Sequence, residues 1–375
     1  MAKFNRAIVS VTNDLYTDQR VHKVCLFLQS QGYSVLLVGR KRKNSVNLPP
    51  RSYQTKRFRL LFDTGGKFYA EYNIRLFFYL LFKPAKILVS NDLDTLLGNY
   101  TASKFKPATQ LIYDSHEYFT EVPELIHRPK IKKIWEGIEG WIFPKLKKIY
   151  TVNDSIAQLY AEKYKKEIKV IRNISPFWSP DQLKSKQELG IPEGKKLIIL
   201  QGAGINIDRG AEEAVESMKW VENSVLMIVG HGDVVEQLKK TVNELNIGDK
   251  VIFYGKKPYL EMMNYTHYAD LGLTLDKATN LNYKYSLPNK VFDYIHTATP
   301  IIATNLIEIS SIVNKYDVGR IIEELTPEKL AGLLNQVLSD DLLLNELKQN
   351  CLKAKEEENW EKETEILKEI YPKID

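Results

Sequence analysis

A glycine-rich loop that ends in an arginine is the clearest candidate for anion binding in the sequence. The run 201–210 reads QGAGINIDRG and separates an apolar segment from an amphipathic one. Gly202 and Gly204 would let the backbone approach a ligand closely, and a helix that begins there offers free N–H groups to an anion. Arg209 adds a permanent charge whose fork of donors suits a phosphate. The run therefore predicts phosphate binding, and its structural alternative is an ordinary strand-to-helix loop with a surface arginine.

A second glycine loop follows the next apolar segment, where 229–233 reads VGHGD and includes Gly230. Val235 stands where the dinucleotide fingerprint requires its third glycine, so a tight turn is the simpler interpretation. The first apolar segment runs into Asn13 and Asp14 with no glycine at all. This pattern disfavours a nicotinamide-dependent dehydrogenase.

The most informative stretch is 285–304, YSLPNKVFDYIHTATPIIAT. Pro288 suits the first turn of a helix over 288–297, with Ser286 or Leu287 at its cap. Lys290 would lie in that turn, where a cation is unfavourable unless an anion is close. Asp293 could then accept hydrogen bonds from a ribose, or it could be a solvated carboxylate on an amphipathic helix. The candidate ligand contacts of this stretch are Ser286, Leu287, Pro288, Asn289, Lys290 and Asp293.

Histidine and aspartate follow two strands of the first half. His116 lies in the run 113–117, YDSHE, where it could donate a hydrogen bond to a leaving oxygen or a sugar hydroxyl. A structural histidine is the alternative. Asp92 and Asp94 match a short two-aspartate metal-binding motif. A chain of this composition is expected to contain about one such match by chance. We therefore predict no metal site.

These candidates sit at the ends of elements that alternate along both halves. Apolar runs predict strands, amphipathic runs predict helices, and the alternation predicts an α/β protein with two doubly wound, Rossmann-like domains. Ligands of such sheets bind beyond the carboxyl ends of the strands, so two domains would face a central cleft. The expected strands are 7–12, 34–38, 86–90, 110–114, 148–152, 197–201, 225–229, 251–254, 271–274, 301–304 and 320–322. The expected helices are 18–31, 93–105, 155–164, 210–219, 234–245, 258–268 and 288–297, with a last helical segment at 360–371.

Length and charge support the same division. The 375 residues suffice for two domains, and a proline-containing stretch at 174–195 marks the boundary. Residues 1–172 carry 30 Lys and Arg against 15 Asp and Glu, whereas the remainder carries 23 against 32. Halves of opposite sign indicate different partners. The basic half predicts a phosphorylated substrate or an anionic membrane, and it lacks the motifs of a nucleic-acid-binding protein.

Three motifs together resemble the retaining glycosyltransferases of the GT-B fold, similar to glycosyltransferase family 4. They are DQRVHK (18–23) before LxxxGYxV, YDSHE (113–117), and LPNKVFDYI (287–295) followed by PIIAT. The resemblance implies an acceptor-binding domain at 1–173, a nucleotide-sugar-binding domain at 174–357, and a closing helix at about 358–375 that crosses back to the first. It implies that Arg209 and Lys290 face the donor phosphates, that Asp293 holds the ribose, and that His116 lies near the donor sugar.

The sequence departs from the family pattern at three positions. Asp293 is one methylene shorter than the family's second glutamate, and Tyr285 stands where the first glutamate is expected. Ala203 lies about where the family has a further basic residue. These departures leave the nucleotide site in place and alter the contacts expected for the donor sugar.

The resulting hypothesis is a metal-independent, cofactor-free hexosyltransferase that moves a sugar from a UDP or GDP sugar to a glycan or lipid-linked acceptor, with retention, in cell-surface polysaccharide or glycolipid assembly. A non-catalytic nucleotide-sugar-binding partner of another transferase and a nucleotide-sugar 2-epimerase remain alternatives. The catalytic candidates are His116, Arg209 and Lys290.

The same sequence predicts a cytoplasmic protein. No signal peptide is expected at the N-terminus, and the longest apolar run, 76–82, is too short to cross a bilayer. Together with the basic runs at 40–43 and 51–59, the run 76–82 could dock on the inner face of a cell membrane. A core helix is the alternative for that run.

Overall fold

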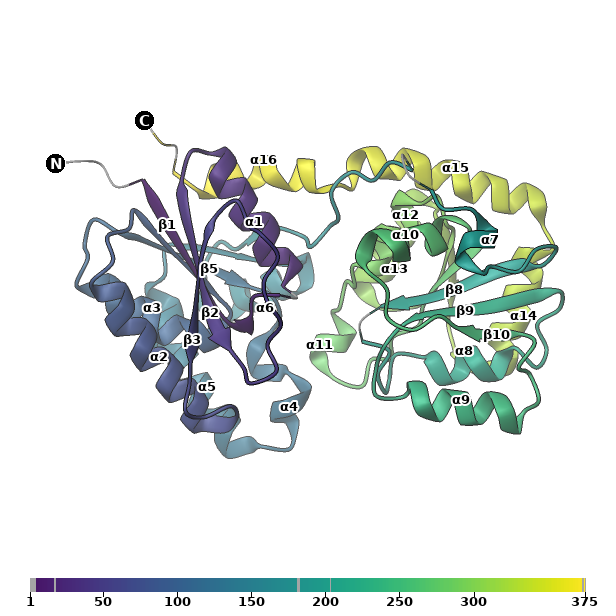
Figure 1. Cartoon of the computed structure of the whole chain (residues 1–375), viewed down its shortest axis with the longest axis horizontal. Coiled ribbons are helices and arrows are strands. Elements are labelled where there is room, and N and C mark those ends of the chain that lie inside the picture. Colours follow the sequence, from purple (N-terminus) through teal and green to yellow (C-terminus); the bar gives the residue numbers. More distant parts are fainter. Residues whose placement is uncertain (1–4, 17, 181–182, 203, 373, 375) are drawn as a thin grey trace. The chain divides into compact units, whose positions relative to one another are not determined.

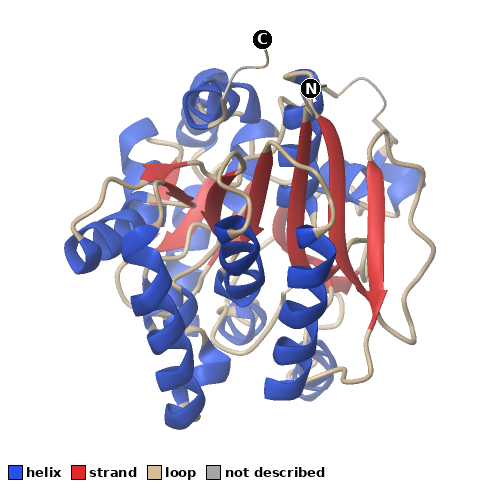
Figure 2. Cartoon of the chain, turned by 90° about the vertical axis from the view of Figure 1, so that its left-hand side faces the viewer, coloured by secondary structure: helices blue, strands red, loops and turns tan. Residues whose placement is uncertain are grey.

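The structure, a computed structural model, describes residues 5–16, 18–180, 183–202, 204–372 and 374, and divides into two compact units (Figure 1). Unit 1 comprises Met1–Asn173 with Thr364–Asp375, and unit 2 comprises Ile174–Glu363. Each unit contains a parallel sheet between helices, and Figure 2 shows strands lying behind a layer of helices. The prediction of a doubly wound α/β architecture is confirmed.

The sheet of unit 1 has seven strands in the order β3-β2-β1-β4-β5-β6-β7. Its direction of winding reverses between β1 and β4, so a crevice is expected beyond the carboxyl ends of those two strands. The central strands are almost fully buried because helices cover both faces. The strands are β1 (Arg6–Asp14), β2 (Ser34–Lys41), β3 (Gln54–Arg59), β4 (Ile87–Asn91), β5 (Gln110–Ser115), β6 (Lys148–Thr151) and β7 (Lys169–Val170).

One face of this sheet is covered by α2, α3 and α5, and the other by α1 and the end of α16 (Figure 1). Tyr371, just beyond α16, packs its ring against Phe27 and hydrogen-bonds Tyr150 at 2.9 Å, which ties the C-terminal segment to unit 1. The helices are α1 (Gln19–Ser30), α2 (Gly65–Leu81), α3 (Leu93–Lys104), α4 (Pro123–Ile126), α5 (Pro129–Ile142), α6 (Asp154–Tyr164) and α16 (Trp360–Ile370), with 3-10 turns at Phe119–Glu121 and Phe143–Lys145.

The sheet of unit 2 has six strands in the order β10-β9-β8-β11-β12-β13, and it reverses between β8 and β11. One apolar core lies under α8, α9 and α14, and a second under α10, α12 and α13. The strands are β8 (Lys196–Gly202), β9 (Ser224–Gly230), β10 (Val251–Phe253), β11 (Leu271–Thr274), β12 (Ile301–Thr304) and β13 (Gly319–Ile322). The helices are α7 (Lys186–Leu189), α8 (Ala211–Ser217), α9 (Val235–Glu244), α10 (Tyr259–His267), α11 (Leu281–Lys284), α12 (Lys290–His296), α13 (Ile307–Tyr316), α14 (Pro327–Leu338) and α15 (Asp341–Glu357).

The start of α12 differs from the prediction. The helix begins at Lys290 with Asn289 as its N-cap, so Ser286 and Leu287 do not cap it. The reason is the short helix α11 just before it, which ends at Lys284. Ser286 to Pro288 must therefore link two helices, and Pro288 only accepts a first-turn hydrogen bond from the Val291 N–H at 3.1 Å.

Several elements of unit 1 were not predicted; β3 is one, and α2, of which only the run 76–82 was considered as a helix, is another. The edge strand β3 buries only Phe58 fully, so its charged residues hide the alternation of a strand. Helix α2 is apolar on two faces, which obscures the period of 3.6 residues. In the part of the chain that the structure describes, no helix is both long and apolar enough to cross a membrane.

Candidate active site

The reversal point of unit 2 brings Arg209 next to a carboxylate that the sequence did not single out. Gly210 has a φ of +72°, and a Cβ there would lie 2.4 Å from the Leu275 carbonyl oxygen. Only glycine lets the loop after β8 approach β11 so closely. Arg209 consequently reaches the residue that follows Leu275, and its Nη1 lies 2.6 Å from Oδ1 of the fully buried Asp276.

Three charged groups meet here, and two are cations. Lys290, at the start of α12, is half-buried and interacts electrostatically with Asp276 and Arg209. Burial lowers the pKa of the Lys290 ammonium, Asp276 opposes that effect, and Arg209 adds to it. For Arg209, burial acts to lower the pKa, but Asp276 outweighs it and the pKa is raised. One carboxylate thus faces two cations, which leaves an excess of one positive charge.

The cluster also contains unused hydrogen-bonding capacity. The Arg209 guanidinium carbon lies 4.2 Å from the centre of the Tyr283 ring. Its Nε is buried and has no partner among the described residues, and the same holds for the Ser286 hydroxyl. Buried polar groups are normally paired, so these two atoms retain capacity to hydrogen-bond an anionic ligand. Sequence reasoning missed Asp276 and Tyr283, although Asp276 closely follows a predicted strand.

The glycines of the two loops serve chiefly to interlock them. A Cβ at Gly230 would lie 2.0 Å from the Gly202 carbonyl oxygen, and the His231 N–H donates to that oxygen at 3.3 Å. Close packing against the Gly202 carbonyl therefore accounts for the glycine at 230, which is the last residue of β9 and not part of a tight turn. Gly204 has room for a side chain, because the nearest atom to a Cβ at this position would be 3.7 Å away. Ala203, where the sequence lacks a basic residue, lies outside the described residues.

Asp293 is committed to the protein's own donors. Its carboxylate is 4% exposed and accepts hydrogen bonds from the hydroxyls of Ser175 and Tyr259, both at 2.8 Å, and from the Gln201 amide at 3.1 Å. A buried carboxylate with three donors anchors α12 to β8 and to the chain that enters unit 2. Contact of Asp293 with a ribose stays a prediction.

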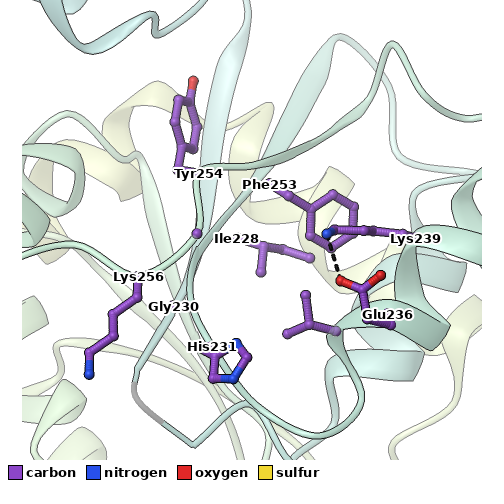
Figure 3. Close-up of a pocket in the computed structure, with 10 residues that line it drawn as sticks. Ile228, Gly230, His231, Glu236, Lys239, Phe253, Tyr254 and Lys256 are labelled. Carbon is purple, nitrogen blue, oxygen red and sulfur yellow. Dashed lines mark hydrogen bonds and ion pairs between the residues drawn. The ribbon is translucent and has the colours of Figure 1, made fainter.

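A cavity of about 280 Å³ lies beyond the carboxyl ends of β9 and β10 (Figure 3). Ile228, Val235 and Phe253 form an apolar wall, and Gly230 and Gly255 contribute backbone. The polar rim consists of His231, Lys256 and the ion pair Glu236–Lys239, which joins Oε1 and Nζ at 2.7 Å. An apolar wall with glycine backbone at its edge suits a heterocyclic base that is recognised by backbone groups. Sequence reasoning missed this cavity, since its lining residues belong to three separate segments.

In unit 1, His116 is held by two carboxylates. Its Nδ1 lies 3.3 Å from Asp92 Oδ2, and its Nε2 lies 3.4 Å from Asp114 Oδ2 and 3.1 Å from the Asn91 amide oxygen. Burial would lower the pKa of the imidazole, but Asp92 and Asp114 outweigh it and raise the pKa to about 9. A raised pKa favours the imidazolium at neutral pH, which is a poor general base, and both of its ring N–H groups face acceptors of unit 1.

Arg20 completes the arrangement and was not predicted as a site residue. Its Nη2 lies 2.7 Å from Oδ1 of Asp114, both side chains are buried, and Nη1 donates to the Ile171 carbonyl at 2.8 Å. Although burial acts to raise it, the pKa of Asp114 falls to about 2 because Arg20 and His116 stabilise the carboxylate. Arg20 belongs to the motif DQRVHK, which was the available signal.

The pKa values of two other carboxyl groups in this cluster are raised, in contrast to that of Asp114. Burial and Asp92 raise the pKa of Asp94 to about 7, and burial and Asp92 raise that of Glu117 to about 8. Asp94 accepts a hydrogen bond from Thr12, which ties the ends of β1 and β4 together. Asp92 itself adopts φ 57° and ψ 169°, and its Oδ1 accepts from the His116 N–H at 2.7 Å. Among the described residues, no group of three His, Cys, Asp or Glu side chains could hold a metal ion.

The second unit of the chain matches a known family. The model described as glycosyl transferases group 1 matches residues 181–357. This part of the chain is similar to the group 1 glycosyltransferases. A comparison with curated proteins finds no match.

Solved structures match almost the whole chain. Sucrose-phosphate synthase from Thermosynechococcus elongatus has a TM-score of 0.76 at 16% identity, with 98% of each chain covered. WaaG, a glycosyltransferase involved in lipopolysaccharide biosynthesis, has a TM-score of 0.72 at 14% identity, with 96% of this chain and 98% of that one covered. HepE from Anabaena in complex with UDP-glucose has a TM-score of 0.72 at 13% identity, with 97% and 98% covered. The chain therefore has the GT-B glycosyltransferase fold that the sequence motifs implied.

Proposed function

We propose that this protein is a glycosyltransferase that moves a sugar from a nucleotide diphosphate sugar to an acceptor hydroxyl. The observation that carries the proposal is the excess positive charge at the reversal point of unit 2, with the buried, unpartnered Nε of Arg209 beside Lys290. A diphosphate supplies the anion that this cluster lacks. The complex of HepE with UDP-glucose supports a donor of the same class.

In this proposal the donor lies along the carboxyl edge of the unit 2 sheet. The cavity beyond β9 and β10 takes the base of a UDP or GDP sugar, Gly202 and Gly204 flank the pyrophosphate, and Asn289 and Lys290 contact it with Arg209. Breaking the anomeric C–O bond transfers negative charge to the diphosphate. Fixed cations stabilise that charge in the transition state more than in the ground state, and neither a metal nor a strong base is then required.

We further propose that unit 1 binds the acceptor, a glycan or a lipid-linked sugar, and that transfer retains the anomeric configuration. His116 is the residue of unit 1 that we place near the donor sugar, and a sugar hydroxyl would have to replace Asp92 or Asn91 as the acceptor of one of its ring N–H groups. The activity would contribute to cell-surface polysaccharide or glycolipid assembly at a membrane surface. Determination of the product anomer by NMR would contradict retention if the configuration were inverted.

A non-catalytic nucleotide-sugar-binding protein is the second candidate, and one observation favours it. Tyr285 stands where the family's first glutamate, a contact to the donor sugar, is expected, so a nucleotide sugar could bind without the contact that supports transfer. Slow hydrolysis of the donor without acceptor, detected as released nucleoside diphosphate, would distinguish an enzyme from a binding protein. Product analysis would separate a transferase from a 2-epimerase.

The donor site is tested by thermal unfolding with UDP, GDP, ADP and CMP in a metal-free buffer. A nucleotide at 100 times its dissociation constant should add about 2.7 kcal/mol to the free energy of unfolding. We expect one nucleoside diphosphate to stabilise the wild type and not Arg209→Ala. Arg320→Ala is the matched control, because Arg320 pairs with Asp317 at 2.7 Å, away from the site on β13. Equal stabilisation of all three proteins would contradict the proposed phosphate site.

A further inference from the structure

Helix α2 presents an apolar stripe that no described element covers. Phe68, Tyr72, Leu76 and Leu80 pack into the core of unit 1 at intervals of four residues. Ile74, Phe78 and Phe82 repeat with the same interval on the opposite side, where they are 58%, 54% and 77% exposed. A helix on the surface of a globular domain normally carries polar residues on that side.

Neighbouring elements extend the stripe. Phe105, at the end of α3, is 68% exposed, and its ring contacts Phe77, which in turn contacts Phe78. On α5, Ile134 and Trp141 are exposed at a spacing of seven residues, which places them on one side of that helix. Because α2, α3 and α5 pack side by side on one face of the sheet, these exposed side chains belong to one layer of the unit.

The charges around this layer are mostly positive. Lys104 and Lys145 place their ammonium groups 4.6 Å and 4.9 Å from the ring centres of Tyr100 and Trp141. Lys130 and Lys133 are exposed on α5, and Lys83 is exposed after α2. The acidic residues are fewer: Glu71 pairs with Arg75 at 2.8 Å, Glu139 is buried, and Glu136 is exposed. Exposed aromatic rings beside lysines suit the boundary between lipid headgroups and acyl chains.

We infer that the outer face of α2, the end of α3 and α5 docks on an anionic lipid bilayer. The inference deepens the proposed association with a membrane: it keeps the run 76–82 and adds residues of α3 and α5 in place of the basic runs 40–43 and 51–59. In the structure Arg40 is buried, lies 4.2 Å from the centre of the Phe68 ring and donates to the Asp63 carbonyl, and Arg57 pairs with Asp14 at 3.2 Å. Those two cations of the runs 40–43 and 51–59 are thus engaged within unit 1.

The test is flotation of the full chain with vesicles of phosphatidylcholine, alone or mixed with phosphatidylglycerol. We expect binding to the anionic vesicles only, and weaker binding as salt is added. The triple variant Phe78→Ser, Phe82→Ser, Trp141→Ser should lose about tenfold in affinity for each ring that inserts. The triple variant Lys104→Gln, Lys133→Gln, Lys145→Gln should lose about fivefold for each lysine at the surface.

Two controls make the result decisive. Leu342 and Leu352 of α15 are 84% and 42% exposed, so Leu342→Ser with Leu352→Ser removes apolar surface from unit 2 and should leave vesicle binding unchanged. Nucleotide stabilisation should persist in both unit 1 variants, which separates failure of docking from failure of the donor site. Absence of binding to anionic vesicles would overturn the inference. So would binding that survives both triple variants, or self-association of the wild type that the aromatic variant abolishes while no vesicle binding occurs.

Discussion

Both units place cations and carboxylates at the point where the winding of the sheet reverses. Among the described residues, the cations are matched by carboxylates in unit 1 and outnumber them in unit 2. In unit 1, Arg20 and the His116 imidazolium face Asp92 and Asp114, and each cation has a carboxylate partner. In unit 2, Arg209 and Lys290 share the single carboxylate of Asp276, and Arg209 Nε has no described partner. Pairing of the first kind maintains a structure, whereas an unbalanced cluster is suited to an anionic ligand.

The largest expected effect is a loss of stability when the Asp114 carboxylate of unit 1 is neutralised. Asp114→Asn would leave the Arg20 guanidinium buried without its counter-ion, because Arg20 and Asp114 are both almost inaccessible to solvent. We expect a loss of about 3–5 kcal/mol in the free energy of unfolding, measured by urea denaturation. Asp14→Asn is the control, since Asp14 pairs with the partly exposed Arg57 and should cost below about 1 kcal/mol. Equal costs would show that the pairing in unit 1 is not structural.

Removal of a cation from unit 2 should instead affect chemistry. We expect Arg209→Ala to lower kcat by about 100-fold to 1000-fold, which is typical for loss of a transition-state donor, with a smaller change in melting temperature. Lys290→Ala should act in the same direction. Donor turnover with purified protein provides the measurement, and Arg320→Ala the control. If a variant instead lost stability while its folded fraction kept the kcat of the wild type, the cations of unit 2 would have a structural role, contrary to this prediction.

The pH dependence of stability should identify the histidine of unit 1. The pKa of His116 is raised to about 9 in the folded protein, against about 6.5 when unfolded, so its stabilising contribution is complete below pH 6.5 and disappears as the pH rises through 9. His116→Gln should remove this part of the slope between pH 6.5 and 9, about 2–3 kcal/mol. The carboxyl groups of Asp94 and Glu117 also make folding less favourable as the pH rises, and because His116 acts to lower their pKa values, this loss should move to higher pH in the variant. Parallel stability curves for the two proteins would refute the assigned protonation of His116.

The smallest expected effect concerns the shared carboxylate of unit 2. Asp276→Asn removes a negative charge from beside the proposed phosphates, so a nucleoside diphosphate should bind more tightly by about 1 kcal/mol, or fivefold. Isothermal titration calorimetry would measure the change. Weaker binding would mean that Asp276 acts by orienting Arg209, and the excess charge would then not be what selects the ligand.

Much of the fold could be predicted from the sequence because buried parallel strands are continuous apolar runs. Segments such as 271–274 and 301–304 were predicted with the bounds that the structure has. The edge strand β3 and the short helix α11 were not, since neither buries enough side chains to impose a pattern. The position of α12 followed from α11, and its start was therefore predicted two residues too early.

What the sequence determined by itself was the alternation of elements, the motifs of the fold, and the placement of Arg209, Lys290 and His116 after strands or at the start of a helix. These depend on local properties, namely hydrophobic period, the glycine conformation and spacing along the chain. Only the tertiary structure decided which charges meet. The Cβ-free approach of Gly210 to Leu275 brings Arg209 to Asp276, and the reversal of the unit 1 sheet brings Arg20 to Asp114, 94 residues away. Whether a cation is paired with a carboxylate or can bind an anionic ligand depends on residues that are distant in the sequence. Local sequence patterns do not reveal these neighbours.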